Sequence, residues 1–253
     1  MTGSLTNFAL LVFIVFCRVG PAVMLLPGFS TPRVPMLARL FLALVVSLAL
    51  APLVSMQNPE LPGLQDHGKF VPVIGMEFVL GLAIGATGSL LIHAVRFAGD
   101  VISNCIGLGG IPGQPIDSNE PLGQIASLLA LSMTLFVFAS GLHLVAIDAL
   151  AGTYSSLPVG KPPGMAILAK SYVSFASSVF LLALQIASPF IAFSLLSNLV
   201  VGLVGRLTPK ISLYFSAVGI IAVVGIALLA VSVHSSLTLF GDRYAAWLAS
   251  EFE

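Results

Sequence analysis

The sequence has very little charge. Only 8% of its 253 residues are Asp, Glu, Lys or Arg, whereas soluble domains carry about 25%. Hydrophobic residues make up 58%, and the formal net charge is zero. A soluble protein with so few charges could not cover its surface, and a neutral chain offers no basic face to nucleic acid. The composition therefore indicates an integral membrane protein that does not bind nucleic acid.

Motifs for catalysis, metals and nucleotides are missing as well. Cys17 and Cys105 lie 88 positions apart, which fits neither a disulfide framework nor a metal site, so both are expected to be packing residues. The chain has no His-Glu-x-x-His, no Gly-x-Ser-x-Gly and no P-loop. His143 and Asp148 would point about 140° apart on a helix. We expect no catalytic residue, no metal and no cofactor, and an intramembrane enzyme remains a hypothesis without positive support.

Long apolar runs dominate the chain instead. Six of them are long enough to cross about 30 Å of hydrocarbon, at about 8–26, 36–56, 70–98, 124–151, 175–205 and 211–240. Short links join the first two runs and the last two, which predicts two antiparallel helical hairpins. Pro189 should kink the fifth run, and Trp247 in the tail should anchor at the membrane interface. We expect an all-α membrane protein of about six long helices, forming a single domain over 1–253.

A segment rich in glycine and proline separates the third and fourth runs. Residues 99–123 contain six glycines and three prolines in 25 positions. Glycine admits unusual backbone conformations and proline removes an amide donor, so one regular helix is not expected there. The segment is also apolar, and irregular backbone at membrane depth occurs only where protein covers it or where it lines a cavity. It is predicted to be either a re-entrant pore or cavity element or an ordinary interfacial loop.

Two charged side chains lie inside the apolar runs. Arg18 is in the middle of the first run, where a guanidinium costs at least about 2.5 kcal/mol on insertion scales. It should either pair with carbonyls or a carboxylate inside the bundle or contact a pore or another subunit; we favour a role in assembly. Glu77 in the third run could be a proton site, but a partner for Arg18 or a neighbouring subunit is favoured, because no second carboxylate lies in its run. Gly81-x-x-x-Gly85 would let another helix approach closely.

Several stretches occur in an order that is typical of one known family. They are Arg18-Val-Gly-Pro-Ala-Val-Met-Leu-Leu-Pro27, Pro35, Arg39, Ala51-Pro52, Leu80–Gly85, Ala98-Gly99, the Gly107 region with Ile116-Asp117, Phe136 to His143, Leu157–Gly160, Ser188-Pro189 and Gly202–Arg206 with Pro209. Over about 18–225 the chain resembles the FliR family of flagellar export-gate proteins, whose injectisome counterparts are the SctT proteins. It departs from the family pattern at Asp117-Ser118, where Asp-Pro is usual, and at Ser212-Leu-Tyr214 and Ala217-Val-Gly219.

The resemblance implies a function without catalysis. The chain would join FliP-like and FliQ-like subunits, and an FlhB-like subunit, in the inner membrane at the flagellar basal body. Their common pore would pass unfolded flagellar subunits out of the cytoplasm. Residues 106–122 would form its plug, with gate residues Ile106, Gly107, Leu108, Gly109, Gly110, Ile111, Pro112, Gly113, Pro115, Ile116 and Asp117. Packing or buried-charge roles, including contacts to sister subunits, would fall to Arg18, Pro27, Glu77, Gly81, Gly85, Arg206 and Pro209.

Elementary physics agrees with a plug at this place. Glycines make a compact backbone, and apolar side chains such as Leu108 and Ile111 exclude water and ions. The alternative is a small-molecule secondary transporter, because interrupted helices are common in such proteins. That reading predicts corresponding breaks in both halves of the chain, and the later runs contain no counterpart of 99–123.

Overall fold

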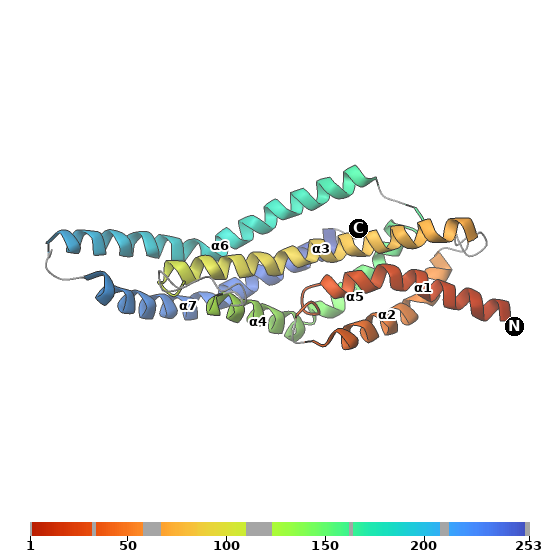
Figure 1. The fold of residues 1–253 in the computed structure, drawn as a ribbon, viewed down its shortest axis with the longest axis horizontal. Helices are drawn as coiled ribbons and strands as arrows, with labels where there is room; N and C mark the ends of the chain where they lie inside the picture. The colour runs from red at the N-terminus through yellow and green to blue at the C-terminus, as the bar shows by residue number, and fades with distance from the viewer. Residues whose placement is uncertain are drawn as a thin grey trace. The chain divides into compact units, whose positions relative to one another are not determined.

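The chain folds into helices. The computed structural model describes residues 2–31, 34–57, 67–109, 123–161, 164–207 and 213–250. Within these ranges there are seven helices and no strand (Figure 1): α1 Thr2–Leu25, α2 Met36–Gln57, α3 His67–Cys105, α4 Gln124–Ala139, α5 Leu142–Ser156, α6 Met165–Leu207 and α7 Leu213–Ser250. Five are long and apolar enough to cross a membrane, and the bent pair of α4 and α5 makes a sixth if it counts as one span. The predicted all-α membrane fold is confirmed.

The contacts within the chain divide the helices into two compact units. Unit 1 comprises Met1–Leu91, Val137–Ala176 and Arg243–Glu253, and unit 2 comprises Ile92–Phe136 and Ser177–Asp242. In unit 1, α2 packs against both α1 and α5. In unit 2, α6 and α7 line one apolar groove together. The two predicted hairpins are therefore present, one in each unit, while a single domain over 1–253 stays a prediction.

The turn after α1 shows why a short link suffices for the first hairpin. Gly28 takes a φ of 95°, which L side chains rarely adopt, and so reverses the chain directly after Pro27. The amides of Phe29 and Ser30 both bond to the Leu26 carbonyl, at 3.2 and 3.1 Å. Both bonds use the carbonyl of the first residue after α1, and they hold the turn that leads the chain back towards α2.

The third apolar run is longer than expected. Helix α3 continues to Cys105, so the part of the glycine-rich segment from Gly99 to Cys105 is helical, and the expectation that the irregular region starts at 99 was wrong. Gly99 lies where α4 packs so closely that a Cβ would overlap Ala126. Ile102, one turn further on, is completely buried. Packing thus outweighs the low helix propensity of glycine at this position.

The fourth apolar run is not one helix. It breaks between Ala139 and Leu142, because Gly141 adopts the left-handed conformation with φ 74°. Its amide bonds to the Phe138 carbonyl at 3.3 Å, and its own carbonyl accepts the Leu144 amide at 2.9 Å. The same residue therefore ends α4 and starts α5, which corrects the expected single span over 124–151.

The tail is part of the core of unit 1. Helix α7 runs through Trp247, whose side chain is only 2% exposed. The indole packs against the rings of Phe175 and Tyr244, with centroids 5.6 and 5.9 Å away. The expectation of an interfacial anchor at Trp247 was wrong, because these aromatic side chains enclose the indole within the protein.

Candidate functional site

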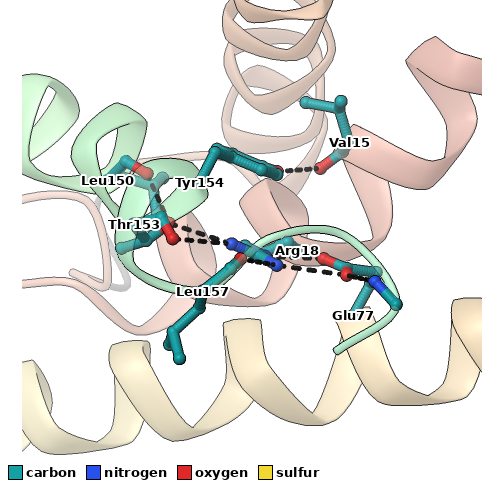
Figure 2. A network of polar contacts seen from close by, with 8 residues as sticks. Val15, Arg18, Glu77, Leu150, Thr153, Tyr154 and Leu157 are labelled. Carbon is teal, nitrogen blue, oxygen red and sulfur yellow. Dashed lines mark hydrogen bonds and ion pairs between the residues drawn. The ribbon is translucent and has the colours of Figure 1, made fainter. Parts of the chain in front are cut away.

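Arg18 and Glu77 form a buried ion pair in unit 1. The Arg18 Nε donates to Glu77 Oε2 at 2.6 Å, and Nη2 donates to Oε1 at 3.1 Å (Figure 2). Both side chains are 0% exposed. The contact is bidentate, which is the strongest geometry for an arginine and a carboxylate. The expectation that Glu77 is the partner of Arg18 inside the bundle is therefore confirmed.

The other donors of the guanidinium are also satisfied. Nη1 donates to the carbonyl and the hydroxyl of Thr153 at 3.3 and 3.2 Å, and Nη2 donates to the Leu157 carbonyl at 3.0 Å. The ring of Tyr154 lies 4.1 Å from Arg18 Cζ, as a cation–π partner. On the carboxylate side, Glu77 Oε1 accepts the Gly160 amide at 3.3 Å. A buried charge pair is tolerated when its hydrogen bonds are made in this way.

This charge cluster joins three helices and one turn. Figure 2 shows Arg18 of α1 between Glu77 of α3 and the end of α5. The Tyr154 hydroxyl returns to α1 by donating to the Val15 carbonyl at 3.3 Å. The cluster therefore fixes how α1, α3 and α5 pack in unit 1. It presents no exposed acid or base that could transfer a proton to a substrate.

Small residues of α3 explain how α1 comes so near. A Cβ on Gly81 would overlap the Arg18 carbonyl, and one on Gly85 would lie 3.0 Å from the Ala22 backbone. One turn later, a Cβ on Gly88 would meet the side chains of Leu26, Pro27 and Trp247 at 3.0–3.1 Å. The helix that approaches Gly81 and Gly85 is thus α1 of the same chain. Close backbone contact through small residues is a common way to pack membrane helices.

The remaining residues with expected packing roles lie apart from this cluster. Pro27 is buried in the turn after α1, whereas Arg206 is exposed in the last turn of α6. A cation there interacts favourably with the negative end of the helix dipole. Pro209 lies outside the described residues.

The start of the predicted plug lies in unit 2, where α3 ends in a closed hydrogen-bonded cap. Gly107 has a φ of 77°, its amide bonds to the Asn104 carbonyl at 3.2 Å, and the Leu108 amide bonds to the Ser103 carbonyl at 2.9 Å. These two bonds and the left-handed glycine define a Schellman motif. The side chain of Ile106 is completely buried, whereas Leu108 is 46% exposed. Gly109 is the last residue of the described range 67–109, and it lies against Asn104. A Cβ on Gly109 would overlap the Asn104 side chain.

The start of α4 lies beside this cap. The Gly123 carbonyl accepts the Ser127 amide at 3.0 Å, which begins the helix. A Cβ on Gly123 would lie 3.4 Å from both Asp100 Oδ1 and Ser103 Oγ. Together with the contact between Gly99 and Ala126, this brings the two ends of the predicted plug segment side by side. We call residues 99–109 and 123–127 the neck.

The middle of the predicted plug cannot be compared with the structure. Gly110, Ile111, Pro112, Gly113, Pro115, Ile116 and Asp117 lie outside the described residues. Their role in a pore therefore stays a prediction from the resemblance.

The other polar candidates do not gather into a site. His143 is half-buried, with Nδ1 3.4 Å from the Val137 carbonyl and its ring 5.0 Å from that of Phe138, while Asp148 is exposed. Cys17 is buried and Cys105 half-buried, and neither is in a disulfide. The described ranges contain no group of three His, Cys, Asp or Glu side chains that could hold a metal ion.

Sequence reasoning missed the residues that complete the charge cluster. Thr153, Leu157 and Gly160 act mainly through backbone atoms, which every residue type has, so their identity carried no signal. Tyr154 could have been noted as an aromatic residue in an apolar run, but its position over Arg18 depends on the break at Gly141.

Comparison with known proteins identifies the family. The model of the family described as "Bacterial export proteins, family 1" matches residues 9–246. The flagellar biosynthetic protein FliR of Caulobacter vibrioides is 32% identical over 231 residues, which cover 91% of each chain. FliR of Escherichia coli is 29% identical over 205 residues, covering 81% of this chain and 77% of that protein. The chain therefore belongs to the FliR family, the non-enzymatic membrane components of the flagellar type III export gate in the bacterial inner membrane.

Proposed function

We propose that this chain forms, with FliP-like and FliQ-like subunits and an FlhB-like subunit, the pore through which unfolded flagellar subunits leave the cytoplasm. Within that pore, the segment that starts at Ile106 and ends before Gly123 acts as the plug. The observation that carries the proposal is the neck, which holds both ends of this segment together and presents an apolar side chain, Leu108, at its start.

The need for partner subunits is supported by apolar surface that the chain leaves uncovered. Only 6% of the most apolar 18 residues of α7 are buried within the chain, and 28% and 33% in the corresponding stretches of α2 and α6. Large apolar side chains such as Leu37 of α2, Leu195 of α6 and Val231 of α7 are 68–81% exposed. Lipid can cover part of this surface, and helices of partner subunits would cover the rest.

The exposed Leu108 supports a sealing role for the plug. Its amide makes one of the two bonds of the Schellman motif, so its backbone is held at the end of α3. An apolar side chain held there on a firm support can exclude water from a narrow channel, and hydrophobic constrictions are known to close pores in this way. A glycine-rich continuation adds little side-chain volume to a passage that must later admit a polypeptide.

The experiment that tests the plug replaces residues 110–121 with a Gly-Ser segment of the same length in the native host. This variant keeps the neck and the chain length but removes the apolar side chains. We expect increased leakage of ions across the inner membrane, with export of flagellar subunits at least partly retained. A deletion of the same residues should leak as well, since both changes leave Leu108 without the apolar side chains that follow it in the plug.

Two controls accompany the variants. Co-purification of the partner subunits shows that the gate has assembled, and a strain without the chain defines the absence of export. An assembled variant gate with no leakage and normal export would mean that the segment is an ordinary interfacial loop.

A second candidate function, small-molecule transport, receives no support from the described cavity. The groove in unit 2 has a volume of about 430 Å³ and is lined by apolar side chains, among them Phe193, Val200 and Ile220, with Ser197 as its hydroxyl group. Substrate sites of small-molecule transporters need precisely placed polar groups that fix the ligand.

A further inference from the structure

We propose that the neck stays closed while the gate works: α3 and α4 remain joined at Gly99 and Ser103, and move together with the part of α7 around Gly225. The inference rests on the proposed function, because it concerns how the predicted plug is held. The proposed function does not say how the plug moves. A plug could also be withdrawn if α3 and α4, the two helices that carry it, moved apart.

The first argument is the contact between Gly99 of α3 and Ala126 of α4. A Cβ on Gly99 would overlap the Cα of Ala126 and lie 2.9 Å from its backbone nitrogen. The two helices therefore touch through main-chain atoms, without side chains that could adapt to a displacement. Ala126 is completely buried. Such close contacts have one well-defined geometry and are lost by a small separation.

The second argument is the socket that α7 provides for Ile106. A Cβ on Gly225 would lie 2.6 Å from Ile106 Cβ, so only glycine leaves space for the isoleucine. Ile106 is 0% exposed, and Gly225 is itself buried on a helix whose residues are mostly uncovered. Next to this pair, Gly107 lies close to Val218, with a Cβ position 3.5 Å from Val218 Cγ1. The end of α3 is thus fixed to α7 by a knob and its matching hole.

The third argument is the closed hydrogen bonding of the cap. The Schellman bonds pair the carbonyls of Ser103 and Asn104 in the last turn of α3 and fix the direction in which the chain leaves the helix. Ser103 is 2% exposed and faces Gly123 across the neck. If α3 and α4 parted here, Gly99 would lose its contact with Ala126, and Ser103 its contact with Gly123, at the same step. A movement that leaves the neck intact avoids this loss.

The geometry offers a direct test by disulfide cross-linking. The Cβ position of Gly123 lies 3.7 Å from Ser103 Cβ, within the 3.5–4.5 Å that a disulfide requires. Gly123 has an ordinary φ, so a cysteine can replace it without backbone strain. The double variant Ser103→Cys/Gly123→Cys is made in a chain that also carries Cys17→Ala and Cys105→Ala. It is expressed in the native host with all gate partners.

The readout compares export before oxidation, after oxidation with diamide, and after reduction. Cross-link formation is measured by thiol labelling of the gate complex. The parent without cysteines and the two single-cysteine chains receive the same treatment, which accounts for effects of the oxidant on the cell. We expect the oxidised double variant to export flagellar subunits at the rate of the reduced form. Loss of export on oxidation that returns on reduction would overturn the closed neck.

The experiment distinguishes a failure of the closed neck from a failure of the proposed function. If a strain without the chain exports normally, the function is refuted, whereas a cross-link that blocks an otherwise active gate refutes only the neck. Should the reduced double variant not export, Gly99→Ala takes its place. We expect that variant to leak ions, because the added Cβ meets main-chain atoms of Ala126 and pushes the two helices apart. A Gly99→Ala gate that assembles, seals and exports normally would also overturn the inference.

Discussion

The buried charge cluster permits a prediction about stability that can be worked from its contacts. Glu77→Leu leaves the guanidinium of Arg18 buried without its counter-charge, although Thr153 and Leu157 still accept its other bonds. Arg18→Met leaves the carboxylate buried with one amide donor, that of Gly160. Removing one partner of a buried ion pair costs about 3–5 kcal/mol. Each single variant should lower the free energy of unfolding by that amount.

The double variant Arg18→Met/Glu77→Leu separates the interaction energy of the two charges from the interactions that each makes with its surroundings. If the two effects were independent, they would sum to roughly 6–10 kcal/mol. With both charges gone, the largest remaining defect is the Gly160 amide without its acceptor, which costs about 1–3 kcal/mol. The double variant should therefore be more stable than either single variant, and the double-mutant cycle should yield a large coupling energy.

The assay is unfolding of the purified chain in detergent micelles, followed by circular dichroism and by fluorescence. The chain has one tryptophan, Trp247, which is buried in unit 1 and reports on the unit that holds the cluster. Thr87→Ala in unit 1 serves as a control: its hydroxyl bonds to the Ala83 carbonyl of its own helix, and a small effect is expected. Additive effects of the two charge substitutions would refute the reasoning, because they would mean that the charges do not stabilise each other.

Three further predictions concern glycines. Gly81→Ala should destabilise unit 1 by about 1–3 kcal/mol through overpacking, whereas Gly75→Ala on the same helix, with no atom within 4 Å of its Cβ position, should be neutral or slightly stabilising in the same unfolding assay. Gly225→Ala should lower the thermal stability of the gate complex by displacing the isoleucine of the neck, and Gly219→Ala on α7 should not. Gly141→Ala should cost about 1–2 kcal/mol for its left-handed backbone, and Gly141→Asn less; equal unfolding midpoints would contradict this.

The membrane spans could be predicted because their signal is compositional. A run of about 20 apolar residues can hardly be anything other than a span in a chain with so little charge, and short links leave a hairpin as the only connection. The break at Gly141 escaped prediction for the same reason. Apolar residues continue on both sides of it, so composition does not change where the helix changes direction.

The extension of α3 beyond Gly99 was not predicted because here the composition changes although the helix continues. Glycine at 99 indicated an irregular backbone, but the decisive quantity is the distance between α3 and α4, which only glycine allows. The cap at Gly107 has a recognisable pattern, a glycine after a helix. Its partners Ser103 and Asn104 follow from the position of the helix end, which the sequence left uncertain.

The charge cluster shows how a residue with a high free-energy cost of burial can select the packing of an apolar helix. A leucine at position 18 would be equally stable against any apolar neighbour, and so would not select one. Arg18 is satisfied only where Glu77, 59 positions later, and the Leu157 carbonyl, 139 positions later, come together. Membrane helices lack a hydrophobic force that distinguishes one partner from another, because lipid is as apolar as the helices themselves. The cost of one buried guanidinium thus makes a single packing of α1, α3 and α5 preferable to its alternatives, in a chain whose other faces remain free for partner subunits.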